Sequence, residues 1–320
     1  MERALRNRLV FGTAMLAALF LLLWLDNAAE AWTKPWMVRS HHQNPVDYGV
    51  GGIGLMIILL SLLPIATDEL AVLFTAENVR PYRIISVLGS GALAFHAFLT
   101  QFPRFKVIAA STLVFIIVFV MLLAALRRAW GRQSKDAIVR MAGTVLATLY
   151  LGGLGWFLMA IRVKHSGHAP NRGFVGSTSV MLMILLAVKS TDIGAYFGGR
   201  AVGRRKLIPW LSPGKTWEGL LCGLLTSAVV GGVCSRYVVG FSGLTWWNGA
   251  LFGAFIGAVG QAGDLLESLM KRDADVKDSG RLIPGFGGVL DVIDSPLFAA
   301  PFAYLWFSLM FHAPGPHKSF

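Results

Sequence analysis

The chain has 320 residues, of which 55% are hydrophobic and only 14% are charged, and its mean hydropathy is +0.61. A soluble domain of this length needs many more charged side chains on its surface, so this composition excludes a soluble protein. The formal charge of +12 does not indicate a nucleic-acid partner, because the basic residues occupy short segments between apolar stretches and form no basic domain interleaved with aromatic residues.

Apolar stretches long enough to cross a membrane recur from one end of the chain to the other. A hydrocarbon core of about 30 Å requires roughly 20 apolar residues in a helix. By this criterion we expect an all-α, polytopic integral membrane protein with about nine transmembrane helices, near residues 9–25, 50–74, 84–100, 107–126, 139–161, 176–198, 217–239, 247–270 and 293–312. The polar and aromatic segment 26–49 is expected to lie at the membrane interface, where the rings of Trp32, Trp36 and Tyr48 are favoured.

The distribution of basic residues favours one orientation. Most lysines and arginines fall in segments on the same side as the N-terminus, so the positive-inside rule predicts a cytoplasmic N-terminus in the inner (cytoplasmic) cell membrane. This orientation places the loops 199–216 and 271–292 in the cytoplasm. We divide the chain into an N-terminal membrane scaffold region, 1–174, with about five spans, and a C-terminal catalytic membrane region, 175–320, with about four.

Ionisable side chains inside a membrane are costly and therefore indicate function. In the N-terminal region, Asp68 and Glu69 near the end of the second span are interpreted more simply as a structural pair or a charged helix end. The C-terminal region is far richer in such side chains: Lys189, Asp192, Glu218, Asp264, Glu267, Asp291 and Asp294.

Two acidic pairs in the C-terminal region have the same spacing. Asp264 and Glu267 are three residues apart and share a helix face, which Ser268 and Lys271 continue, and Asp291 and Asp294 repeat the spacing at the start of the last span. Carboxylate oxygens suit Mg²⁺, which keeps water and substrate phosphates in its shell. Between the pairs lie cations able to hold a polyphosphate and a glycine-rich segment able to approach one closely: Lys271, Arg272, Lys277, Arg281 and residues 284–288.

A second polar cluster is the run from Ser212 to Gly219. Its Gly-Lys-Thr tripeptide is no P-loop, because that motif needs a glycine at position 209, which is Pro209. Ser212, Lys215 and Thr216 at the start of a helix are nevertheless suited to binding an anion. The histidines His41, His42, His165 and His168 have no carboxylate or cysteine at ligand spacing and are interpreted as solvated loop residues.

Together these clusters resemble the signature of the bacterial phosphatidate cytidylyltransferase (CDP-diacylglycerol synthase) family. The signature runs Ser-x-x-Lys-Arg, four residues, Lys-Asp, a short gap, Pro-Gly-His-Gly-Gly, two residues, and Asp-Arg-x-Asp-Ser. The matching positions are Ser268, Lys271, Arg272, Lys277, Asp278, Pro284, Gly285, Gly287, Gly288, Asp291, Asp294 and Ser295. The runs 192–200 and 212–219 also resemble the family, so the resemblance covers about residues 190–296. Phe286 replaces the signature histidine, and Val292 replaces the signature arginine.

The resemblance implies transfer of CMP from CTP to phosphatidic acid, giving CDP-diacylglycerol and pyrophosphate for phospholipid biosynthesis, with membrane lipids as the surroundings. It implies catalytic roles for Asp264, Asp291, Lys271 and Lys277, with Mg²⁺ held by Asp264 and Asp291 and further by Asp294 and Glu267. It leaves open whether a monovalent cation joins Mg²⁺. The expected substrate-binding residues are Ser212, Lys215, Thr216, Glu218, Asp192, Ser268, Arg272, Asp278, Gly287 and Gly288.

Two other functions stay open at this stage. A membrane transporter would line an ion path with charges near the membrane midplane in both halves, and a catalytically inactive relative with a scaffolding role would be consistent with Phe286 and Val292. A homodimer is also open, because Gly249, Gly253 and Gly257 at four-residue spacing permit close helix contact between chains or within one chain.

Overall fold

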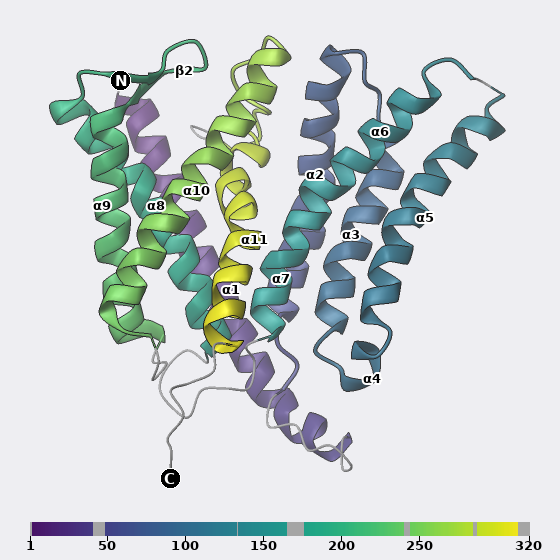
Figure 1. Ribbon diagram of the computed structural model, residues 1–320, viewed down its shortest axis with the longest axis horizontal. Helices are drawn as coiled ribbons and strands as arrows, with labels where there is room; N and C mark the ends of the chain where they lie inside the picture. Colours follow the sequence, from purple (N-terminus) through teal and green to yellow (C-terminus); the bar gives the residue numbers. More distant parts are fainter. Residues whose placement is uncertain are drawn as a thin grey trace.

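In the computed structural model, residues 2–40, 49–132, 134–164, 176–239, 244–283 and 287–312 are described. They fold into helices that stand side by side (Figure 1). The first half comprises α1 (Glu2–Ser40), α2 (Ile53–Ala76), α3 (Arg83–Leu99), the short α4 (Pro103–Lys106), α5 (Ala109–Trp130), α6 (Ala137–Thr148), the π-helix η1 (Leu149–Gly153) and α7 (Leu154–Lys164). The second half comprises α8 (Gly176–Val202), β1 (Lys206–Ile208), β2 (Ser212–Thr216), α9 (Trp217–Cys234), the π-helix η2 (Ser235–Val239), α10 (Trp246–Asp273) and α11 (Leu290–His312).

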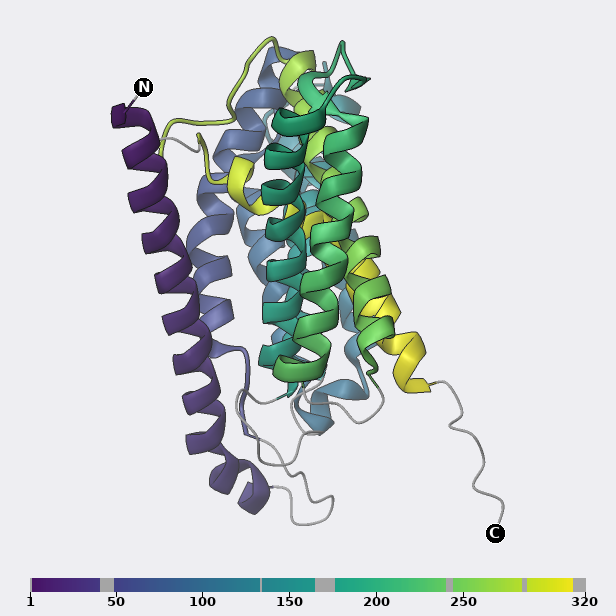
Figure 2. The same ribbon diagram turned by 90° about the vertical axis from the view of Figure 1, so that its left-hand side faces the viewer.

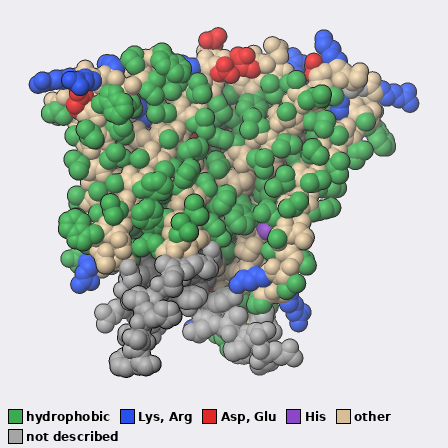
Figure 3. Space-filling view, viewed as in Figure 1, with side chains coloured by type: hydrophobic (Ala, Val, Ile, Leu, Met, Phe, Trp, Pro, Cys, Tyr) green, Lys and Arg blue, Asp and Glu red, His purple; other side chains and the backbone are tan. Residues whose placement is uncertain are grey.

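The helices confirm a polytopic, all-α membrane protein. Within the described ranges, eight helical segments are long and apolar enough to cross a membrane, and α6, η1 and α7 together form one of them, Ala137–Val163. The apolar helix α3 is shorter, at 17 residues, and brings the arrangement to the nine spans expected from hydropathy. Hydrophobic side chains cover the visible flank of the bundle, and charged side chains gather towards its two ends (Figure 3).

The two ends of the bundle differ in their connections. We call the end where α1 begins, which also carries the β1–β2 hairpin and the α10–α11 connection, the N-side, and the opposite end the C-side (Figures 1 and 2). The first turn of α11 lies below the N-side ends of α2 and α10, so the connection before it dips into the bundle (Figure 2).

The sequence predicts that the first span ends at residue 25, and the structure corrects this boundary. Helix α1 continues without a break to Ser40, and its apolar stretch extends over Gly12–Val38. Two acids in this stretch are buried because Arg162 of α7 neutralises them: its Nε lies 2.7 Å from Asp26 Oδ2 and its Nη2 lies 2.8 Å from Glu30 Oε2. Residues 41–48, with His41, His42 and Tyr48, lie outside the described part of the chain, as do His165 and His168.

Helices α8, α9 and α10 pack closely through small residues. Ser227 of α9 donates a hydrogen bond of 2.6 Å to the Gly253 carbonyl of α10, and a Cβ at Gly253 would overlap the Ser227 carbonyl. Gly249 faces Gly231 of α9 and Ser235 of η2 in the same way, and Gly257 faces Thr191 and Ser227. The glycine face that left a homodimer open is therefore used inside this chain.

One feature has no counterpart among the elements expected from the sequence. The segment between α8 and α9 forms a two-stranded antiparallel hairpin, in which Lys206 pairs with Thr216 and Ile208 pairs with Ser212. The Trp217 N–H donates to the Arg205 carbonyl, which fixes the hairpin against the first turn of α9. The hairpin thereby holds Lys215 at the N-side of the bundle.

Candidate functional site

Glu69 of α2 organises the start of α11. Its carboxylate accepts hydrogen bonds from the N–H groups of Val289, at 3.0 Å, and Leu290, at 2.8 Å, and from the Ser279 hydroxyl, at 3.3 Å. The first N–H groups of a helix have no partner within the helix, and the positive end of the helix dipole favours a carboxylate there. Glu69, interpreted from sequence as a structural pair or charged helix end, is thus buried at the site, whereas Asp68 is exposed and pairs with Arg83.

Two glycines make room for this buried carboxylate. A Cβ at Gly280 or at Gly288 would overlap the oxygens of Glu69. The connection between α10 and α11 therefore lies close against α2, and the first half of the chain contributes directly to the shape of the site.

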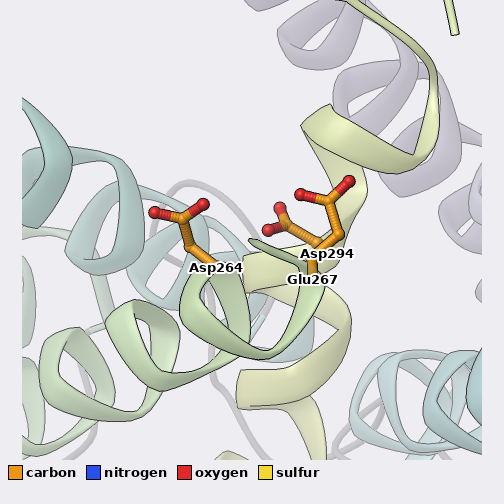
Figure 4. Close-up of side chains that lie close together, drawn as sticks. All are labelled: Asp264, Glu267 and Asp294. Carbon is orange, nitrogen blue, oxygen red and sulfur yellow. The ribbon is translucent and has the colours of Figure 1, made fainter. Parts of the chain in front are cut away.

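Three carboxylates from two helices meet just below the N-side. Asp264 and Glu267 come from α10 and Asp294 comes from α11, and one oxygen of each lies within 4.8 Å of the others (Figure 4). Glu267 and Asp294 are buried, and Glu267 Oε1 is a buried atom without a hydrogen-bond partner among the described residues. Crowded, incompletely bonded carboxylates repel one another, and a divalent cation with oxygen preference satisfies them. The donor set therefore fits Mg²⁺.

Asp291, the other expected metal ligand, lies outside this cluster. Its Oδ1 accepts from Lys271 Nζ at 2.7 Å, and its Oδ2 accepts from the N–H groups of Gly288, at 2.7 Å, and Ser279, at 3.1 Å. Lys271 also bonds Glu267 Oε2 at 2.7 Å. Asp291 thus fixes the α10–α11 connection and connects it, through Lys271, to the carboxylate cluster.

The hairpin and the start of α9 bring a second cation to the cluster. Lys215 of β2 forms an ion pair with Asp264. The Thr216 hydroxyl accepts a hydrogen bond of 3.1 Å from the Gly219 N–H and caps α9, a local role that its sequence position indicates. Glu218 accepts from the N–H groups of Arg204, at 3.0 Å, and Arg205, at 3.1 Å, so its carboxylate holds the hairpin. Ser212 is half-buried in β2.

The remaining residues expected at the site lie on α8, on α10 and in the α10–α11 connection. Asp192 of α8 accepts a 2.6 Å hydrogen bond from Gln261 of α10. Arg272 reaches back to the Leu211 carbonyl at 3.4 Å. Ser268 is half-buried on α10, Lys277 and Asp278 are exposed in the α10–α11 connection, and Gly287 has a φ of +101°, which favours glycine. Pro284, Gly285 and Phe286 lie outside the described residues.

The comparisons with known proteins agree with the geometry. The sequence pattern of a family described as "Cytidylyltransferase family" matches residues 48–310. A phosphatidate cytidylyltransferase of Haemophilus influenzae is 40% identical over 158 residues, 48% of this chain and 53% of that protein. Proteins of the same name are 40% identical in Synechocystis over 200 residues, 56% of this chain and 66% of that protein, and 38% identical in Bacillus subtilis over 164 residues, 51% and 57%. The chain thus spans between 53% and 66% of the length of these relatives.

Proposed function

Since this chain belongs to the cytidylyltransferase family, we propose that it transfers CMP from CTP to phosphatidic acid, releasing pyrophosphate and leaving CDP-diacylglycerol in the membrane. The N-side would face the cytoplasm of the cell, in the inner membrane, because the substrate nucleotide is water-soluble and the N-side carries the hairpin and the α10–α11 connection, which are rich in Lys and Arg.

One observation carries the proposal: the carboxylates of Asp264, Glu267 and Asp294 meet within 4.8 Å of one another, beside two lysines, inside a membrane bundle. A water-soluble triphosphate and a lipid head group can meet only near the membrane surface. A cluster sunk slightly below the N-side, reached by cations on both flanks, has the position and the charges that this meeting requires.

We propose that Asp264, Glu267 and Asp294 hold Mg²⁺. When bound there, the ion would offset the negative charge of the crowded phosphates and of the departing pyrophosphate. Asp291 is a weaker candidate ligand, because its oxygens already accept from Lys271, Ser279 and Gly288.

The reaction itself needs little acid–base assistance from the protein. A phosphomonoester has a second pKa of about 6 and is already anionic at neutral pH. Its oxygen attacks the α-phosphorus of CTP, a new P–O bond forms, and the bond between the α-phosphorus and the bridging oxygen breaks with release of pyrophosphate. The task of the chain is to align the two phosphates and to offset their charge. Lys215 and Lys271 can do this by exchanging a carboxylate partner for a phosphate oxygen.

An assay with purified full chain in detergent tests the proposal. Labelled CTP, Mg²⁺ and phosphatidic acid should give labelled CDP-diacylglycerol, and Asp264→Asn should abolish it. Asp68→Asn is the matched control, since Asp68 is an exposed acid at the N-side end of α2, outside the cluster. Activity retained in Asp264→Asn would contradict the metal assignment. Failure of wild-type protein to release pyrophosphate with any phospholipid would contradict the proposed reaction and favour a transporter or an inactive scaffold.

A further inference from the structure

Lys189 is a basic residue inside a membrane span, and the reaction described above assigns it no role. It belongs to α8, whose apolar stretch is Ser177–Val202. At 1.5 Å per residue it lies roughly 20 Å along the helix from the N-side end at Val202. A charged side chain within an apolar span is costly and faces a polar cavity or a partner. Its surroundings therefore indicate what it binds.

The ammonium of Lys189 has protein partners that do not use all of its hydrogen-bond donors. It donates a 3.4 Å hydrogen bond to the Val292 carbonyl of α11 and lies 3.9 Å from Asp192 Oδ2, at the outer limit of an ion pair. The other oxygen of Asp192 accepts from Gln261. An ammonium has three donors, and the Lys189 side chain is 40% exposed. Protein contacts among the described residues thus leave it able to bind a further acceptor.

The ammonium also belongs to the electrostatic surroundings of the acidic cluster. Lys189 Nζ contacts the carbonyl of Val292, two residues before Asp294, and Asp192 beside it accepts from Gln261, three residues before Asp264. Lys215 and Lys271 approach the cluster from the hairpin and from the last turns of α10. Lys189 approaches it from α8, farther from the N-side end of its helix. The cluster therefore has a third cation beside it, carried by α8 within an apolar span.

The position that Lys189 contacts is also where the sequence departs from the family signature. Where the family signature that this sequence resembles has an arginine, this chain has Val292 on α11. Lys189 Nζ lies against the backbone of the same residue. A lysine of α8 is thus present beside the backbone of the residue that stands where the signature has arginine.

We propose that Lys189 binds the phosphate of the lipid substrate and replaces, from α8, the charge that Val292 lacks. This inference rests on the proposed function. The shared chemistry is a phosphate oxygen, which CTP also offers, but Lys189 lies within the apolar stretch Ser177–Val202. This position favours the lipid phosphate, whose glycerol and acyl chains stay in the bilayer.

Steady-state kinetics in mixed micelles separate the two phosphates. Loss of a charge-assisted hydrogen bond in Lys189→Met should raise the KM for phosphatidic acid roughly tenfold to a hundredfold, with the KM for CTP nearly unchanged. Lys189→Arg should keep most of the lipid affinity, and Val292→Arg added to Lys189→Met should restore part of it. Arg127→Met, which removes an exposed cation from the last turn of α5, is the control and should change neither KM. A raised KM for CTP alone, or an unchanged KM for the lipid, would overturn the proposal.

A second measurement uses unmodified protein and does not depend on turnover or on the folding of a variant. Lys189 is acylated with an amine-reactive reagent and quantified by peptide mass spectrometry. Phosphatidic acid should protect it severalfold, whereas diacylglycerol, which lacks the phosphate, and CTP should not. Equal protection by diacylglycerol, protection by CTP alone, or no protection would overturn the inference. If protection is seen but no CDP-lipid forms, the inference holds and the proposed reaction fails.

Discussion

Two clusters of buried charge, one centred in each half of the chain, are built in opposite ways. In the first half Arg162 faces Asp26 and Glu30 at 2.7 and 2.8 Å, and the most exposed of the three side chains is only 6% accessible. In the second half three carboxylates meet within 4.8 Å, and Glu267 Oε1 has no hydrogen-bond partner among the described residues. A closed set of opposite charges holds helices together. In the second cluster Asp264 and Glu267 also pair with lysines, but the three carboxylates remain crowded and one oxygen is unbonded, so they are suited to a cation from outside.

The largest effect on folding is expected from a change to Arg162, which pairs with Asp26 and Glu30. Arg162→Met would leave Asp26 and Glu30 buried without their cation, which costs about 3–5 kcal/mol. We expect little monodisperse protein in detergent and a much lower unfolding temperature. The triple variant Arg162→Met, Asp26→Asn, Glu30→Gln should regain most of the stability, because no unpaired charge remains. Wild-type stability in Arg162→Met alone would show that the cluster does not hold α1 and α7 together.

Loss of a charge from the carboxylate cluster of the second half should lower turnover without lowering stability. Asp294→Asn removes one of three crowded charges, so the protein should remain folded and its stability without divalent ions should stay the same or rise. Turnover should fall roughly 10²–10³-fold, the magnitude typical of a lost group that stabilises transition-state charge. Addition of Mg²⁺ should raise the unfolding temperature of wild-type protein but not that of the variant. An equal Mg²⁺-induced shift in both proteins would remove Asp294 from the metal site.

Glu69 of the first half bonds the start of α11 in the second half. Its replacement should lower turnover less than Asp294→Asn does. In Glu69→Gln the charge-assisted hydrogen bonds from Val289, Leu290 and Ser279 are weakened, at a cost of about 1.5–3 kcal/mol in local stability. We expect roughly tenfold lower turnover and faster hydrogen exchange at Val289 and Leu290, with the unfolding temperature changed only slightly. Unchanged exchange at these two amides would contradict the capping role.

The smallest effect on turnover and stability is expected from Asp68, the residue before Glu69 in the sequence. Asp68 and Arg83 form an ion pair of 3.5 Å whose side chains are 61% and 51% exposed, and such pairs contribute about 0–1 kcal/mol. Asp68→Asn should therefore change turnover and unfolding temperature very little. If it lowered turnover as much as Glu69→Gln does, the distinction between these neighbouring acids would be wrong.

The sequence predicts the parts of this molecule that depend on local pattern. Runs of apolar residues mark the spans because each helix must satisfy its own backbone in lipid. The three-residue spacing of Asp264 and Glu267 predicts that they share one face of a helix. In the structure Asp294 of α11 joins these two residues in one carboxylate cluster. The family signature assigns the chemistry because its residues lie close together in the sequence, from Ser268 to Ser295.

Local sequence patterns do not predict contacts between segments that are far apart in the sequence. Arg162 lies 132 and 136 residues from its two carboxylate partners, and no local feature of the polar segment 26–49 indicates that Asp26 and Glu30 are buried. Glu69 bonds amides 220 and 221 residues away. The sequence does not indicate the hairpin, because proline and glycine in its second strand are typical of a loop. The metal role of Asp291 stays a prediction, although its oxygens are engaged elsewhere.

The distance in sequence between Glu69 and its donors has a consequence for biogenesis. A chain made from its N-terminus inserts α2 long before Val289 and Leu290 exist. Until then the Glu69 carboxylate, seven residues before the N-side end of α2, must be hydrated at the membrane boundary, since an unsatisfied charge in lipid is costly. Only the arrival of α11 exchanges that water for two backbone N–H groups. The reaction centre is therefore completed among the last steps of synthesis, and a nascent chain that stops before α11 carries no assembled site.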